Sequence, residues 1–106
     1  MSARKLGLLL STPPSHPSVE TVVQLAQAAL RRGVEVYLYL IDEGVRMAVD
    51  QRYLGLIDAG VKMSVCAYGC QQHGVLTTTV DSRASLSGLV VLSGIIDSCD
   101  RFLAFT

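Results

Sequence analysis

The feature that most constrains the fold of this chain is a series of short runs rich in apolar residues. A segment with helical periodicity separates each run from the next. The runs cover residues 5–10, 34–41, 61–65 and 102–105. A strand that is apolar at successive positions is typical of a sheet covered on both faces, and such sheets are mostly parallel. The alternation therefore predicts an α/β fold: a three-layer α/β/α sandwich with a small, mainly parallel sheet and a flavodoxin-like appearance.

The segments between these runs predict the helices and loops. Helical spacing of apolar residues is found over residues 18–32, over 45–49 with 53–59 (one interrupted helix or two short ones), over 67–73 and over 85–98. Gly33, Gly60 and Gly74 follow three of these segments and are well placed to end them. We expect irregular structure in the proline-rich residues 11–17 and the threonine-rich residues 75–84, and a single domain over residues 1–106.

The composition excludes several classes of protein. Nine basic and nine acidic residues give no net charge, the basic ones are scattered, and Trp is absent, so direct nucleic-acid binding is not expected. No apolar stretch approaches the length of about 20 residues that spans a membrane, and the apolar run near the N-terminus is too short for a signal peptide. Three cysteines without framework spacing favour a cytoplasmic protein with reduced thiols.

The apolar content also predicts association. Half of the 106 residues are hydrophobic and only 17% are charged. A domain of this size buries only about two-thirds of the surface of its unfolded chain. We therefore expect partner subunits to cover part of the apolar surface, most simply in a homo-oligomer.

Cys66 is the candidate catalytic residue because it lies where the third predicted strand ends and a helix begins. The carboxyl ends of parallel strands are where ligands and reactive groups gather. A helix start offers unpaired backbone N–H groups, which favour the thiolate, and the thiolate is the nucleophile. The alternative interpretation is a small buried side chain, since free cysteines are often buried.

Other candidates surround this position in the sequence. Cys70 would share a helix face with Cys66 and is either a resolving thiol or a packed small residue. His16, in the first loop at the same edge, is a candidate neighbour of Cys66. His73 lies about 10 Å further along the helix, too far to act as a base, and a structural role is expected. Asp42 and Glu43 are explained most simply by a turn and a helix start.

No cofactor or metal site is predicted. Cys66, Cys70 and His73 come from one short helix and do not converge on a tetrahedral zinc site. No glycine-rich nucleotide motif and no nucleophile elbow is present. Cys99 precedes the last strand, at the opposite edge of the predicted sheet, and is expected to pack in the core.

Two blocks of residues resemble the DsrE/TusD-like (DsrE/DsrF-type) sulfur-relay family. One is the hydrophobic strand that ends in Cys66 with Gly74-Val75 eight residues later. The other comprises Leu86-Ser87-Gly88-Leu89 and Cys99 to Phe105. The similarity covers nearly the whole chain, although the family's helix after the cysteine typically ends in Arg-Arg-Gly and this one reads Gln71-Gln72-His73-Gly74.

The resemblance implies a small α/β/α fold that assembles into trimers or hexamers, and a cysteine that accepts sulfane sulfur as a persulfide. Cys66 matches that cysteine. The expected function is a cytoplasmic sulfur carrier of sulfurtransferase type, with donor and acceptor proteins as partners, in a homo- or hetero-oligomer. Two alternatives stay open: a dithiol oxidoreductase using Cys66 and Cys70, and a non-catalytic assembly or ligand-binding module.

Overall fold

A sheet of five parallel strands organises the protein, whose computed structural model describes residues 3–106. The strands are β1 (Lys5–Leu10), β2 (Glu35–Leu40), β3 (Lys62–Cys66), β4 (Ser85–Ser87) and β5 (Arg101–Phe105). Their order across the sheet is β4-β3-β2-β1-β5, and every neighbouring pair is parallel. All carboxyl ends therefore meet at one edge of the sheet, as the sequence predicts.

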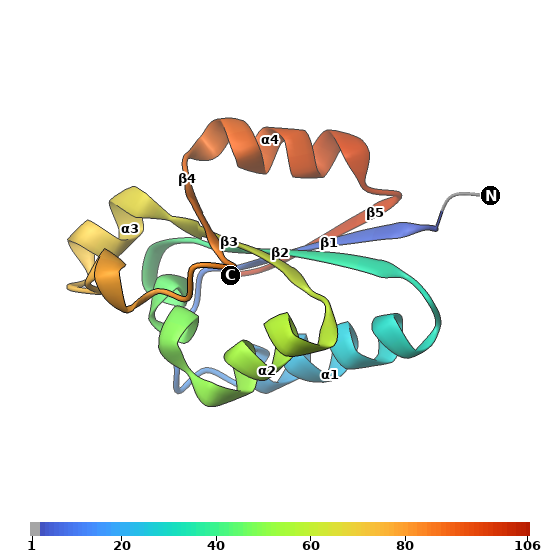
Figure 1. Ribbon diagram of the computed structural model, residues 1–106, viewed down its shortest axis with the longest axis horizontal. Helices are drawn as coiled ribbons and strands as arrows, with labels where there is room; N and C mark the ends of the chain where they lie inside the picture. Colours follow the sequence, from blue (N-terminus) through green and yellow to red (C-terminus); the bar gives the residue numbers. More distant parts are fainter. Residues whose placement is uncertain (1–2) are drawn as a thin grey trace.

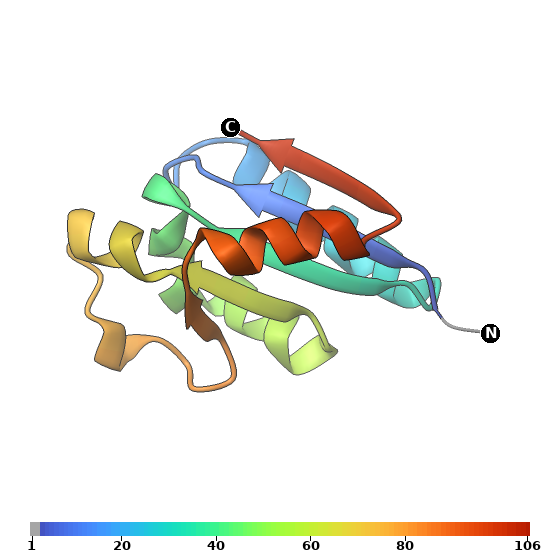
Figure 2. The same ribbon diagram turned by 90° about the horizontal axis from the view of Figure 1, so that it is seen from above.

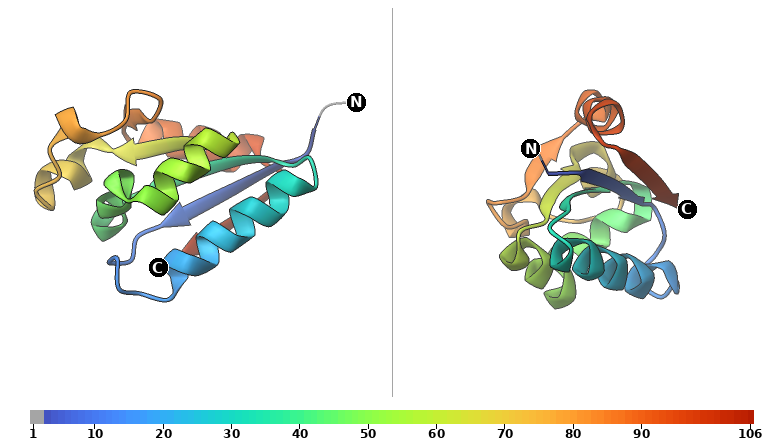
Figure 3. Two further views of the ribbon diagram at one scale, coloured as in Figure 1. Left: turned by 60° about the horizontal axis from the view of Figure 1, so that its bottom comes forward. Right: turned by 90° about the vertical axis from the view of Figure 1, so that its right-hand side faces the viewer.

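Helices cover both faces of this sheet and form the outer layers of the sandwich. They are α1 (Ser18–Arg31), α2 (Gln51–Ala59), α3 (Ala67–Gln72) and α4 (Leu89–Ser98), with 3-10 helices η1 (Asp42–Val49) and η2 (Thr77–Thr79). Figure 1 shows α1 and α2 below the sheet, and α4 crosses the other face without a neighbouring helix (Figure 2). The end-on view in Figure 3 shows these three layers, so the predicted α/β/α sandwich is confirmed. Within residues 3–106, no helix has both the length and the apolar character needed to cross a membrane.

The main core lies between the sheet and the pair of helices α1 and α2. Leu8, Leu38 and Met63 lie side by side on three neighbouring strands and face these helices in a buried row. Tyr53 of α2 is fully buried, and its hydroxyl donates a hydrogen bond of 2.8 Å to the carbonyl oxygen of Val19 in α1. This bond satisfies the one polar atom of the Tyr53 side chain and ties the two helices together.

The predicted helix over residues 85–98 is wrong at its start. Ser85–Ser87 forms the edge strand β4, which pairs with β3 so that Ser85 lies opposite Ser64 and Ser87 opposite Cys66. Gly88 then precedes the helix Leu89–Ser98. Three residues at a sheet edge, two of them serine, carry no continuous apolar run, and Leu86 happens to match the helical spacing of the residues that follow.

A close backbone contact positions η1 against the end of β1. Gly44 is buried, and a Cβ atom there would clash with the carbonyl oxygen of Leu10 and lie 2.8 Å from its carbonyl carbon. Asp42, where η1 begins, adopts the left-handed backbone conformation with a φ of 52°. The chain thus turns sharply after β2 and runs along the edge where Cys66 lies.

Candidate functional site

Cys66 is both the last residue of β3 and the N-cap residue of α3. Its backbone is extended, and its Sγ accepts a hydrogen bond of 3.4 Å from the backbone N–H of Gly69. Because α3 has only six residues, this direct N–H contact, rather than a long row of aligned peptide dipoles, is the main aid to negative charge on the sulfur.

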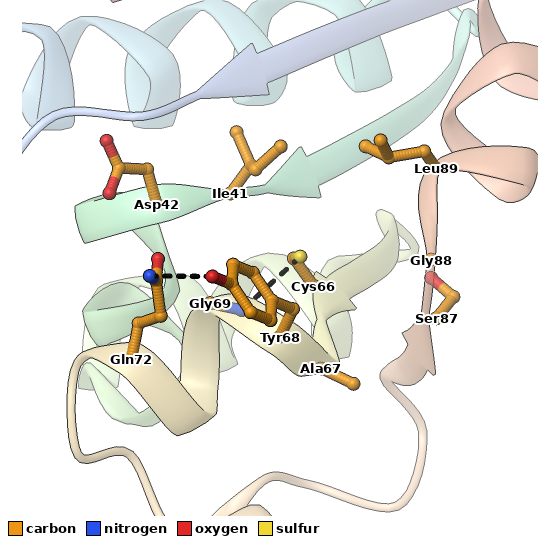
Figure 4. A pocket seen from close by; sticks show the side chains of 10 residues that line it. All are labelled: Ile41, Asp42, Cys66, Ala67, Tyr68, Gly69, Gln72, Ser87, Gly88 and Leu89. Atoms are coloured by element: carbon orange, nitrogen blue, oxygen red, sulfur yellow. Dashed lines mark hydrogen bonds between the residues drawn. The ribbon is translucent and has the colours of Figure 1, made fainter.

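A pocket of about 500 Å³ opens beside this sulfur (Figure 4). It is lined by residues from three segments of the chain: Ile41, Asp42, Cys66, Ala67, Tyr68, Gly69, Gln72, Ser87, Gly88 and Leu89. Only 6% of Cys66 is exposed, so the pocket is the route to the thiol. Its volume is in the range of sites that hold small molecules or an inserted side chain.

The walls of the pocket are largely apolar and carry little charge. Ile41 and Leu89 contribute aliphatic surface, and a hydrogen bond of 2.9 Å from Gln72 Nε2 to the Tyr68 hydroxyl holds the aromatic ring at its edge (Figure 4). None of the lining residues is cationic. The backbone N–H of Gly69 is therefore the positive group that the pocket itself offers to a thiolate.

Gly69 is needed for this arrangement because α3 packs closely on η1. A Cβ at Gly69 would lie 2.8 Å from Cγ1 of Val45 and 3.3 Å from the backbone nitrogen of Asp42. A larger residue would push α3 away from η1 and move the N–H that meets Cys66. The glycine thus connects a packing requirement to the geometry of the thiol.

The two histidines occupy separate places. His73, at the end of α3, forms a 2.7 Å contact between its Nε2 and Oδ1 of Asp42. This pair joins the end of α3 to the start of η1. His16 lies in the β1–α1 loop, where its Nδ1 accepts a 3.1 Å hydrogen bond from the Ser18 N–H, and it is not among the residues that line the pocket.

The remaining cysteines are free thiols that lie outside the pocket lining. Cys70 is fully buried, and burial, followed by the charge of Cys66, raises the pKa of its thiol. Cys99 is partly buried with its Sγ close to Gly7, and burial raises its pKa as well. Within residues 3–106, no group of three or more His, Cys, Asp or Glu side chains is placed to hold a metal ion.

Reasoning from the sequence missed two hydroxyl groups near Cys66. Ser87 lies beside Cys66 on the neighbouring strand and also lines the pocket, while Tyr39 of β2 is fully buried on the same face of the sheet. Ser87 was hidden by its assignment to a helix. Tyr39 stands in a run that is apolar on both faces, so the sequence does not show which way it points.

The model of the DsrE/DsrF-like family matches residues 4–105 of the chain. The chain belongs to the DsrE/DsrF-like family. Membership confirms the resemblance seen in the sequence, and it covers the β3–α3 junction with Cys66, the edge strand β4 and the final strand β5. No match is found among curated proteins.

Solved structures show that the fold of this DsrE/DsrF-like chain recurs in distant proteins. The ychN protein from E. coli has a TM-score of 0.83 at 17% identity, with 98% of this chain and 100% of that one covered. BT1422 from Bacteroides thetaiotaomicron, a conserved protein of unknown function, has a TM-score of 0.78 at 15% identity, covering 95% and 94%. MTH1491 from Methanobacterium thermoautotrophicum, also of unknown function, has a TM-score of 0.71 at 13% identity, with 96% of this chain and 99% of that one covered. At these identities the similarity shows the fold alone.

Cys66 and Cys70 of this DsrE/DsrF-like protein are expected to react with an alkylating reagent at different rates. In the native protein near neutral pH, Cys66 should be labelled roughly tenfold or more faster than Cys70, because the pocket reaches only the first of them. The raised pKa of Cys70 means that its thiolate forms only at more alkaline pH, so its labelling should increase there. Peptide mapping by mass spectrometry after timed iodoacetamide treatment measures the order.

A Cys70→Ala variant is the control, and it should leave the labelling rate of Cys66 unchanged. Equal rates at Cys66 and Cys70 in the native protein would contradict the different accessibility of the two sulfurs.

Proposed function

We propose that Cys66 accepts sulfane sulfur as a persulfide and passes it to a partner protein. The observation that supports this most directly is the Cys66 sulfur beside an open pocket, with the Gly69 N–H bonded to it, in a chain of the DsrE/DsrF-like family. The Cys66 thiolate attacks the outer sulfur of a donor persulfide, RS–SH. The S–S bond of the donor breaks, Cys66–S–SH forms, and the donor leaves as the thiolate RS⁻.

The character of the pocket suits this chemistry. The apolar walls shield a persulfide from bulk solvent, while the opening at the edge of the sheet admits another thiol. Delivery is the same exchange in the opposite sense, with an acceptor thiolate attacking the outer sulfur of Cys66–S–SH. The exchange balances without an oxidant, a metal or an organic cofactor, and the reducing conditions of the cytoplasm would keep Cys66 available.

The dithiol alternative has less structural support. A resolving thiol must reach the sulfur that it attacks, and Cys70 is fully buried, has a raised pKa and does not line the pocket. A Cys66–Cys70 disulfide would therefore require α3 to rearrange.

We also propose that copies of this chain associate through α4. Six of the ten residues of this helix are Leu, Val or Ile, yet only Ile95 is buried in the single chain. The large hydrophobic side chains that it leaves exposed are Leu89, Val90, Val91 and Ile96. An exposed apolar surface of this kind is typical of an interface. Because Leu89 also lines the pocket, a second copy seated on α4 would lie next to the entrance to Cys66.

Intact-protein mass spectrometry tests the carrier function. Wild-type protein incubated with a persulfide donor and freed of excess reagent should gain about 32 Da, one sulfur atom, on Cys66. Cys66→Ser should gain nothing, whereas Cys70→Ala and Cys99→Ala should load like the wild type. A loaded protein should lose the added mass when an acceptor thiol is supplied.

Three results would count against this function. Absence of loading in the wild-type protein would favour an assembly or ligand-binding module. Equal loading in Cys66→Ser would place the sulfur elsewhere. A loss of about 2 Da that depends on Cys70 would favour the dithiol oxidoreductase, since that is the mass change of disulfide formation.

A further inference from the structure

Two buried hydroxyl groups near Cys66 have no hydrogen-bond partner. Among the residues that the structure describes, three buried side-chain polar atoms are unpaired: Oγ1 of Thr12, Oη of Tyr39 and Oγ of Ser87. Buried polar groups in native proteins are nearly always paired, and each exception calls for an explanation. Two of the three lie on the face of the sheet that carries Cys66, so both hydroxyls are available to a group bound there.

Strand register brings these two hydroxyls to the sulfur. Cys66 and Ser87 are direct neighbours on β3 and β4, so their side chains leave the sheet on the same face. Tyr39 lies opposite Ser64, two positions before Cys66, and therefore shares that face as well. The Tyr39 hydroxyl lies within hydrogen-bonding range of both Ser87 and Cys66, and both influence its ionisation, although in the empty protein neither contact has the geometry of a formed hydrogen bond.

We propose that the hydroxyls of Tyr39 and Ser87 form a binding subsite for the outer sulfur of the Cys66 persulfide. The inference rests on the proposed carrier function and specifies where the transferred atom is held. The ligand is a sulfur anion, Cys66–S–S⁻, formed when the loaded persulfide releases its proton to solvent. Each hydroxyl donates one hydrogen bond to that anion, so two orphaned donors acquire an acceptor at the moment of loading.

The Tyr39 hydroxyl is suited to donate because it stays protonated. Burial raises the pKa of Tyr39, and negative charge on Cys66 raises it further, since a phenolate beside a thiolate would be repelled. Ser87 lines the pocket directly, so the subsite is continuous with the route by which a donor enters. The N–H of Gly69 meets the inner sulfur, Sγ of Cys66, and the two hydroxyls serve the outer one.

The test compares Tyr39→Phe and Ser87→Ala with the wild-type protein, each loaded with a persulfide donor. Two quantities are measured. One is the half-life of the added sulfur, and the other is the pH at which the rate of alkylation of the loaded persulfide reaches half of its maximum. Removing a hydrogen-bond donor destabilises the persulfide anion. The pH of half-maximal alkylation rate should therefore rise by about one unit, and the half-life of the added sulfur should fall about tenfold.

Tyr53→Phe is the matched control for a purely structural effect. Tyr53 is as fully buried as Tyr39, but its hydroxyl is paired with the Val19 carbonyl, away from the pocket. This variant should unfold at a lower temperature than the wild type and show unchanged sulfur chemistry. Tyr39→Phe should show the reverse, because removing an unpaired buried hydroxyl does not cost stability in the empty protein.

The outcomes separate the two proposals. If the wild-type protein does not load, the carrier function fails and the subsite fails with it. If the wild type loads and both Tyr39→Phe and Ser87→Ala match its half-life and pH profile, the carrier function stands and the subsite is wrong. Equal changes in Tyr53→Phe would also overturn the subsite, because they would reflect packing. Ser87→Ala, at the sheet edge, supplies the answer if Tyr39→Phe does not fold.

Discussion

Gly44→Ala is expected to lower the free energy of unfolding by about 3 kcal/mol, the largest effect that a single added methyl group should have in this protein. The new Cβ would meet the carbonyl group of Leu10 and approach the Cα of Ser11 to 3.3 Å. These are backbone atoms, so no side chain can rotate away, and the clash is relieved only if η1 moves off the end of β1. Urea unfolding followed by circular dichroism measures the change.

Gly55→Ala is the matched control for this variant. Gly55 lies inside α2, and a Cβ there meets nothing within 4 Å. Alanine is the better helix former, so this variant should be more stable than the wild type by up to about 1 kcal/mol. If Gly44→Ala unfolds at the same urea concentration as the wild type, the close contact between η1 and β1 does not exist in solution.

Val90→Asp is expected to convert assembled protein into monomers while leaving the monomer folded. Val90 is 88% exposed in the single chain, so its replacement removes no internal packing. An aspartate in the first turn of α4 is even favourable for the helix, because negative charge stabilises a helix N-terminus. In an interface the same carboxylate would lose its hydration without a partner charge. Sedimentation velocity and thermal unfolding measure assembly and folding separately.

Gln27→Glu adds the same charge on the opposite layer and serves as the control. Gln27 is an exposed residue of α1, on the face of the sheet away from α4. This variant should sediment like the wild type. Association that is unchanged in Val90→Asp and lost in Gln27→Glu would assign the interface to α1, contrary to the proposal for α4.

The sequence predicts most of the sheet because its inner strands are short runs rich in apolar residues. It does not predict β4, since a three-residue edge strand with serines at 85 and 87 has neither an apolar run nor enough length for a pattern. In the structure Asp50 caps α2 by accepting a 2.9 Å hydrogen bond from the Arg52 N–H, and this cap divides residues 42–59 into η1 and α2. The two short helices considered from the sequence are thus present.

The candidate site, too, is predicted from the sequence only where a local pattern marks it. The position of Cys66 could be predicted because a strand pattern stops and a helical one begins at that residue. The pocket could not, since it combines Ile41, Tyr68 and Leu89 from segments that meet only in the folded chain. The same holds for the contact of His73 with Asp42, which joins residues 31 positions apart. Local spacing carries no information about such contacts.

If Cys66 carries sulfur as proposed, its recessed place sets a condition on the donor and the acceptor. A cysteine fixed on a broad, flat surface would be stopped at the rim by Tyr68 and Leu89 before its sulfur came within bonding distance. Donor and acceptor must instead present the sulfur at the tip of a slender, protruding arm, such as a flexible tail or a narrow loop. The shape of the entrance thus selects partners by their outline before any specific bond is formed.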